Sequence, residues 1–138
     1  MPSPLAFISY DFKLSNNERQ SLIAGIGSCS EPFDVDDWSA QRKAPREDWD
    51  KLVHGKIWRS DFLIVLVATD MDREAVELEI LEAKRCNVPF FGIYVGDAKS
   101  GTALPSGLPA NRVIPNDWDR IALAVRQVAK EGKHHTFT

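Results

Sequence analysis

The sequence predicts an α/β fold, in which a parallel β-sheet carries helices on both of its faces. Two apolar runs, FLIVLV at residues 62–67 and VPFFGIYV at residues 88–95, indicate strands that are buried on both faces, as in parallel sheets. Segments in which apolar residues recur at helical spacing separate the predicted strands. This alternation of strand and helix is typical of parallel strands joined by right-handed crossovers.

The first half of the chain supplies two strands and two helices. In order, we expect a strand at residues 5–9, a helix over 15–28, a strand at 31–35 and a helix over about 45–58. Ser15 and Glu18 have the spacing of a capping box, which predicts the start of the first helix. Pro45 suits the first turn of the second helix, after a polar loop that begins at Asp36.

The second half continues the same pattern. In order, we expect a strand at residues 62–67, a helix over 73–86, a strand at 88–95, an edge strand at 112–114 and a last helix from about 117 to 129. Asp70 or Asp72 is expected to cap the third helix, and Asn116 or Asp117 the last one. Residues 96–111 are rich in Gly, Ser, Ala and Pro, which indicates a surface loop.

Five such strands predict a flavodoxin-like three-layer sandwich with a five-stranded parallel sheet in the order 2-1-3-4-5. In this order the direction of winding reverses between the first and third strands, and ligands bind at the carboxyl ends of those two strands. The ends are Ser9–Tyr10–Asp11 and Ala68–Thr69–Asp70, and the loop Asp36–Asp37–Trp38 belongs to the same rim. The sequence therefore predicts a ligand crevice at this edge of the sheet.

The predicted helix over residues 73–86 contains an anomaly. Its apolar stripe consists of Ala75, Val76, Ile80, Ala83 and Cys86. Glu79 falls near the middle of the stripe, whereas the opposite, solvated side carries Glu74, Glu77 and Lys84. Burial of a carboxylate is unfavourable unless the group is paired or used, so two interpretations stay open. Glu79 either makes a structural cap or salt bridge at the sheet edge, or it is a functional group in the crevice.

Length and composition limit the remaining choices. With 138 residues and a formal net charge of −3, we expect one domain over residues 1–131, followed by a polar tail over 132–138. No basic stripe of the kind that binds nucleic acid is present. The longest apolar run is too short to span a bilayer, and the N-terminal residues do not resemble a signal peptide. We therefore expect a cytoplasmic protein that binds neither nucleic acid nor membrane.

The sequence spacing predicts no metal site. Cys29 and Cys86 have neither metal-binding nor redox spacing, and both are expected to be small core residues in a reducing compartment. His54 is expected on a helix flank, and the other two histidines stand in the polar tail. The acidic run Asp34–Asp37 is more typical of a solvated turn than of a divalent-cation site.

Two common uses of this architecture fit the sequence poorly. A phosphate-binding enzyme would have a glycine-rich turn after the first strand, but this turn is SYDFKLSNN. A two-component receiver would have an acidic pair there, a phosphoacceptor Asp after the third strand and a Lys after the last one. Asp70 could be the acceptor, but Tyr10–Asp11 is a poor acidic pair and no Lys follows Ile114.

The chain resembles TIR domains at this edge. Phe7–Ile8–Ser9–Tyr10 resembles the first TIR motif, and the loop with Asp36–Asp37–Trp38 occupies the place of the TIR BB loop. The strand at 62–67, followed by a helix with Glu79 about two turns in, resembles the NAD-cleaving TIR pattern Ser-x-x-(aromatic)-x-x-x-Glu. The resemblance covers residues 5–129, and the stretch Phe33–Trp38 is similar to FD-x-x-x-W of short bacterial antiphage TIR proteins of the Thoeris type.

The sequence departs from that pattern at two places. Ala75 stands where the family usually has a Trp, four residues before the Glu. Thr69–Asp70–Met71 replaces the Ser or Asn that usually begins the motif. These departures concern the shape of the substrate site more than the fold.

The resemblance implies an NAD nucleosidase or ADP-ribosyl cyclase that cleaves the nicotinamide–ribose bond, with NAD as substrate and no cofactor. Glu79 is the implied catalytic residue, because a carboxylate stabilises the ribosyl cation and bonds the ribose hydroxyls. Tyr10 and Trp38 are expected to stack a base, although both also suit packing roles. The full set of expected substrate-binding residues is Ser9, Tyr10, Asp11, Asp37, Trp38 and Thr69.

The product and the partners follow from the resemblance only as expectations. Water would give ADP-ribose, and an adenine nitrogen would give a cyclic ADP-ribose that signals to a separate effector protein in antiphage defence. Expected partners are other TIR surfaces, including further copies of this chain, and a phage-derived trigger. Two alternatives remain: a TIR interaction module without chemistry, and an enzyme that transfers deoxyribose between nucleobases.

Overall fold

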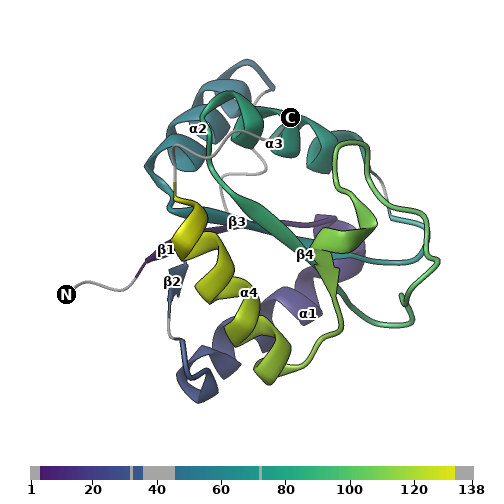
Figure 1. Cartoon of the computed structure of the whole chain (residues 1–138). Helices are drawn as coiled ribbons and strands as arrows, with labels where there is room; N and C mark the ends of the chain where they lie inside the picture. Colours follow the sequence, from purple (N-terminus) through teal and green to yellow (C-terminus); the bar gives the residue numbers. More distant parts are fainter. Residues whose placement is uncertain (1–3, 32, 36–45, 72, 133–138) are drawn as a thin grey trace.

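The computed structural model describes residues 4–31, 33–35, 46–71 and 73–132, and arranges them in three layers (Figure 1). The middle layer is a five-stranded parallel sheet in the order β2-β1-β3-β4-β5, which confirms the predicted fold class. The strands are β1 (Leu5–Ser9), β2 (Asp34–Val35), β3 (Phe62–Val67), β4 (Phe90–Tyr94) and β5 (Val113–Ile114). Strand β3 is buried along its whole length, as its continuous apolar sequence predicts.

Helices cover both faces of the sheet. The α-helices are α1 (Phe12–Gly25), α2 (Arg46–Arg59), α3 (Glu74–Arg85) and α4 (Trp118–Glu131), and the 3-10 helices are η1 (Ile26–Ser28) and η3 (Ala110–Arg112). Helices α1 and α4 pack with Ile8, Ile64 and Leu66 on one face. Helices α2 and α3 pack with Phe7 and Val65 on the other. The two separate cores follow from the alternation of side chains along each strand.

Two predicted boundaries differ from the structure, and one predicted cap is confirmed. Helix α1 begins at Phe12, so Ser15 lies inside the helix and the predicted capping box is wrong. The S-x-x-E pattern failed because Ser and Glu are also tolerated in helix interiors. Strand β2 has two residues rather than five, since it is an edge strand that pairs with β1 alone. The predicted cap at Asp117 is confirmed, because its side chain accepts a hydrogen bond of 3.1 Å from the Asp119 backbone N–H.

The predicted cap of α3 at Asp70 is wrong. Asp70 is exposed and has a φ of 59°, in the left-handed region that Asp tolerates better than most residues. The helix instead has Arg73 at its N-cap position, and no side-chain bond caps it. The other proposed cap, Asp72, lies outside the described residues. Asp70 therefore turns the chain at the carboxyl end of β3.

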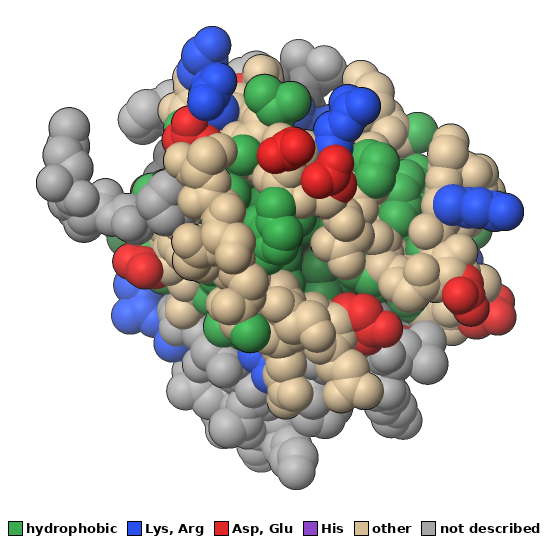
Figure 2. Space-filling model, turned by 90° about the horizontal axis from the view of Figure 1, so that it is seen from below, with side chains coloured by type: hydrophobic (Ala, Val, Ile, Leu, Met, Phe, Trp, Pro, Cys, Tyr) green, Lys and Arg blue, Asp and Glu red, His purple; other side chains and the backbone are tan. Residues whose placement is uncertain are grey.

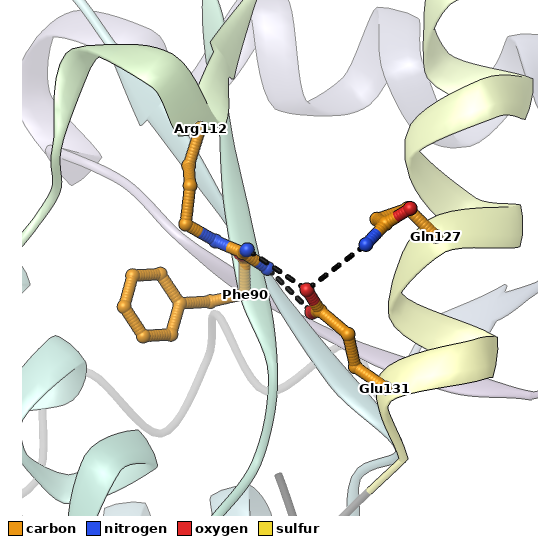
Figure 3. Close-up of polar contacts among 4 residues, drawn as sticks. All are labelled: Phe90, Arg112, Gln127 and Glu131. Carbon is orange, nitrogen blue, oxygen red and sulfur yellow. Dashed lines mark hydrogen bonds and ion pairs between the residues drawn. The ribbon is translucent and has the colours of Figure 1, made fainter. Parts of the chain in front are cut away.

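Arg112 ties the amino ends of the strands, here called the amino edge of the sheet, to α4 (Figure 3). Its Nε donates to the Phe90 carbonyl oxygen at 2.8 Å, and its guanidinium lies 5.6 Å from the centre of the Phe90 ring. Its two terminal nitrogens donate to the two carboxylate oxygens of Glu131 at 3.0 and 2.6 Å. Gln127 Nε2 also donates to Glu131, at 3.2 Å. This bidentate ion pair fixes the last turn of α4 against the start of β4.

Figure 2 views the α1 and α4 side, where Lys and Arg side chains stand at separate positions rather than in a continuous basic area. No helix in the described part of the chain is both long enough and apolar enough to cross a membrane.

Candidate functional site

A buried hydrogen bond joins the carboxyl end of β1 to α3. Ser9 is the last residue of β1, and its Oγ donates to Glu79 Oε1 at 2.7 Å. Both side chains are completely inaccessible to solvent. Ser9 pairs with Val65 of β3 across the two strands where the winding of the sheet reverses. The pair therefore occupies the part of the sheet where this class of fold binds ligands.

The predicted position of Glu79 on α3 is confirmed. Val76, Ile80 and Ala83 are buried around it, so the carboxylate lies within the apolar stripe of the helix. Burial removes a carboxylate from water, and a hydrogen-bond donor is needed to compensate part of that cost. The Ser9 hydroxyl supplies one such bond, which also fixes the position of the carboxylate. A structural link and a catalytic group both remain compatible with this geometry.

Tyr10 lies on the other side of the sheet from this pair. Adjacent residues of an extended strand point to opposite faces, and Tyr10 packs in the α1 and α4 core. Its ring is 5.4 Å from the guanidinium carbon of Arg19, and both residues are buried. The structure thus brings Ser9 together with Glu79 but does not bring Tyr10 to them.

Two of the other expected site residues lie along the rim. Asp11 is half-buried directly after Tyr10, and Thr69 is exposed after the end of β3. Asp37 and Trp38 lie outside the described residues. Sequence reasoning can place these positions at one edge of the sheet, but the direction of each side chain depends on the packing of the helices.

Glu77 differs from the exposed residue that the helical pattern predicts. It is half-buried, and its carboxylate accepts a hydrogen bond of 2.6 Å from the backbone N–H of Ser106. The loop before η3 folds over this part of α3 and covers it. Glu74, one turn earlier, is exposed as predicted and is therefore the better control for substitutions at Glu79.

Two surface pockets lie near the site without including it. One, of about 790 Å³, lies between α3 and the loop at Ser106–Gly107. The other, of about 520 Å³, lies at the carboxyl ends of β4 and β5 and is lined by Tyr94, Gly96 and Lys99 among others. Neither includes Ser9 or Glu79, which agrees with their complete burial.

A cluster of metal-ligating side chains, which the sequence spacing did not predict, lies between α2 and α3. His54 Nδ1 contacts Glu82 Oε1, and Cys86 Sγ lies 3.8 Å from the same oxygen. Glu82 and Cys86 are four residues apart, which places them on one face at the end of α3. That spacing is a signal in the sequence, but His54 joins it only through the packing of two helices.

Comparisons with known proteins bear on the fold. No protein-family model matches the chain, and no curated protein sequence does. The Clostridium botulinum CMP N-glycosidase BcmB has a similar structure, with a TM-score of 0.58, 14% identity, and coverage of 89% of this chain and 98% of that one. A prokaryotic SEFIR domain is also similar, with a TM-score of 0.50, 16% identity, and coverage of 93% and 91%. At these identities the likeness concerns the fold, and the chain has a TIR-like α/β fold, as the SEFIR domain does.

Proposed function

We propose that this protein is an N-glycosidase that cleaves the bond between nicotinamide and ribose in NAD, with Glu79 as its catalytic carboxylate. The observation that carries the proposal is the buried Ser9–Glu79 hydrogen bond at the carboxyl ends of the central strands. An apolar helix stripe has little structural need for a carboxylate, and strongly desolvated carboxylates are common in active sites. The structural likeness to a CMP N-glycosidase supports the broader reaction class.

The proposed reaction needs little proton transfer before the bond breaks. When the C–N bond breaks, its electron pair moves to the nicotinamide nitrogen, which loses its positive charge, and an oxocarbenium-like ribosyl cation remains. The Glu79 carboxylate stabilises that cation and bonds the ribose hydroxyls. Ser9 acts as a positioning residue, because its hydroxyl holds Glu79 Oε1. Water then attacks the cation and releases one proton to give ADP-ribose, and attack by an adenine nitrogen instead gives a cyclic product.

A second candidate is an N-glycosidase acting on a pyrimidine nucleotide, which the likeness to the CMP enzyme favours. Cytosine is a neutral leaving group and needs protonation as it departs, so this reaction requires a general acid as well as a carboxylate. Glu79 is the one completely buried carboxylate among the described residues. One buried carboxylate suffices for a leaving group that is already cationic. NAD is therefore the favoured substrate of the two.

Access to Glu79 requires movement, because neither Ser9 nor Glu79 is exposed. Substrate binding therefore includes an opening between the end of β1 and α3, and closure afterwards excludes water from the cation. A neighbouring copy or a phage-derived trigger would promote that opening. If so, turnover per protomer rises with protein concentration or with trigger, and strong activity of an untriggered monomer at high dilution contradicts this part of the proposal.

The experiment that tests the function is a base-release assay on the full chain with three substrates. NAD, CMP and a mixture of a deoxynucleoside with a second free base are incubated separately, and free nicotinamide, cytosine or the new nucleoside is quantified. The proposal expects nicotinamide release, with loss of turnover in Glu79→Gln and unchanged turnover in Glu74→Gln. Cytosine release alone would establish the second candidate, and deoxyribosyl transfer alone the transferase. Absence of all three products under every condition would favour an interaction module.

Trp38→Ala tests whether the loop after β2 contributes to substrate use. The residue is expected on the rim of the crevice, where an indole would stack a base, and loss of that stacking is expected to raise KM about tenfold. KM for NAD and the melting temperature are measured together. A large fall in melting temperature with unchanged KM would show that Trp38 has only a packing role.

A further inference from the structure

We propose that His54, Glu82 and Cys86 bind one transition-metal ion of the zinc class, which would bridge α2 to α3. The candidate donor atoms of the three side chains all lie within 4.8 Å of one another. They comprise an imidazole nitrogen, a carboxylate oxygen and a thiol sulfur, contributed by two helices. The proposed site is separate from the Ser9–Glu79 pair and does not depend on the proposed reaction.

The distances between the donor atoms are close to those between the ligand atoms of a bound zinc ion. Tetrahedral zinc with bond lengths of about 2.0–2.3 Å holds its ligand atoms roughly 3.3–3.7 Å apart. The distance between Cys86 Sγ and Glu82 Oε1, 3.8 Å, already approaches this range. His54 Nδ1 contacts Glu82 Oε1 directly and has to move outward to admit an ion. The side chain of His54 is 59% exposed, so rotation of its ring meets little resistance from packing.

Neighbouring groups hold the carboxylate in a suitable orientation. The Glu82 side chain is 17% exposed, and Arg85 Nη1 lies 3.7 Å from its second oxygen, Oε2. This contact leaves Oε1 directed toward His54 and Cys86, which is the arrangement that outer partners impose on metal ligands. The Arg85 charge also repels a cation, so we expect an affinity below that of a site with four protein ligands.

The chemistry of the donors selects the class of ion. A thiolate and an imidazole favour zinc, cobalt or copper over magnesium and calcium, which prefer oxygen ligands. Three protein ligands leave one position of a tetrahedral ion for water. Metal binding displaces the proton of the Cys86 thiol, so binding weakens as the pH falls. Glu82 lies three residues after Glu79 on the same helix, and a bridge here would stabilise the helix that carries the candidate catalytic group.

Cobalt provides a spectroscopic test on the full chain. Metal-free protein is titrated with Co²⁺, because cobalt–thiolate bonds absorb in the near ultraviolet, and Zn²⁺ is then added as a competitor. The proposal expects one ion per chain, a thiolate absorption band, and loss of that band when Zn²⁺ displaces Co²⁺. Cys86→Ser removes the band, and His54→Ala weakens Co²⁺ binding by about tenfold or more. Zn²⁺ raises the melting temperature of the parent but not that of Cys86→Ser.

Two controls separate this site from other donors in the chain. Cys29→Ser removes the other thiol, which is buried and donates to the Glu31 carbonyl oxygen, and the band is expected to persist. Replacement of both tail histidines, His134 and His135, by Ala removes a competing pair and is expected to leave the band unchanged. A band that survives in Cys86→Ser, or its absence from the parent under saturating Co²⁺, would overturn the proposal. His54→Ala with parental affinity would also overturn it, because His54 is exposed and its loss leaves the fold intact.

Discussion

A glutamate lies at each end of the parallel strands, one at their amino ends (the amino edge) and one at their carboxyl ends (the carboxyl edge). The surroundings of the two glutamates differ. At the amino edge, Glu131 is held by the Arg112 guanidinium in a bidentate pair that joins α4 to the start of β4. At the carboxyl edge, Glu79 accepts a bond from the Ser9 hydroxyl within an apolar helix stripe. The first arrangement neutralises a carboxylate and fixes two elements, as a stabilising contact does. The second positions a carboxylate where ligands bind in folds of this kind.

Left-handed residues occur at both edges, at Asp70 and Gly96 on the carboxyl edge and at Asn87 just before β4 on the amino edge. The amino edge also has hydrogen bonds that tie its strands together. At the amino edge, the Leu5 N–H donates to Asp61 Oδ2 and the Asp61 N–H donates to the Leu5 carbonyl oxygen, so β1 and β3 are tied at their starts. At the carboxyl edge, Asp70 and Gly96 both have φ values of 59°. Left-handed turns let the chain leave the strands abruptly and leave room beside their ends. The hydrogen bonds at the amino edge therefore favour a stabilising role there, and our proposal places the chemistry at the carboxyl edge.

Arg112→Ala is the substitution with the largest expected effect on stability. It leaves Glu131, whose side chain is 7% exposed, without its guanidinium partner at the end of α4. We expect the free energy of unfolding to fall by about 2–3 kcal/mol, with turnover per folded protein unchanged. Urea unfolding and base release measure the two effects. Lost turnover in a variant that still folds would mean that the amino edge also serves the chemistry.

Ser9→Ala and Ser60→Ala form a matched pair across the two edges. Both serines are completely buried, and Ser60 donates to the Lys56 carbonyl oxygen at 2.7 Å just before β3. Each loss is expected to cost about 1–2 kcal/mol of unfolding free energy. Only Ser9→Ala is expected to reduce kcat, since it releases Glu79 from its fixed position. Equal kcat values in the two variants would contradict the proposed role of Ser9 in positioning Glu79.

Gly96→Ala has the smallest expected effect. The space beside Gly96 accepts a methyl group, since the nearest atom to an added Cβ is Glu18 Oε1 at 3.7 Å. The cost is therefore backbone strain at positive φ, about 1 kcal/mol. Gly55→Ala in α2 is the control, because nothing lies within 4 Å of its added Cβ and its helical propensity improves by about 1 kcal/mol. A melting temperature that rises in both variants would show that the turn at Gly96 relaxes easily.

The sequence allowed prediction of the sheet because its central strands are apolar without interruption. Strand β3 matches its predicted limits at 62–67, and the stripe that contains Glu79 follows from helical spacing. Short or ambiguous signals failed: β2 is a two-residue edge strand, and the S-x-x-E pattern at Ser15 lies within a helix. Edge strands and caps depend on a few local bonds, which the tertiary context overrides.

The candidate site was predicted in part, because topology determines the edge but not the direction of a side chain. Glu79 and Ser9 are 70 residues apart, and their hydrogen bond depends on how α3 packs against β1. Strand alternation already implies that Tyr10 faces away from Ser9, although both belong to the same rim. His54 meets Glu82 and Cys86 only because α2 and α3 pack together, and no spacing in the sequence indicates that contact.

The most direct test of the account compares Glu79→Gln with Glu131→Gln. Both changes keep the shape of the side chain and remove its charge. For Glu79→Gln we predict loss of nicotinamide release from NAD by a factor of about 10³, with unfolding free energy within about 1 kcal/mol of the parent. For Glu131→Gln we predict parental turnover and a loss of about 1–3 kcal/mol in stability. The opposite pattern, a destabilised Glu79→Gln that turns over NAD at the parental rate, would contradict the assignment of chemistry to the carboxyl edge.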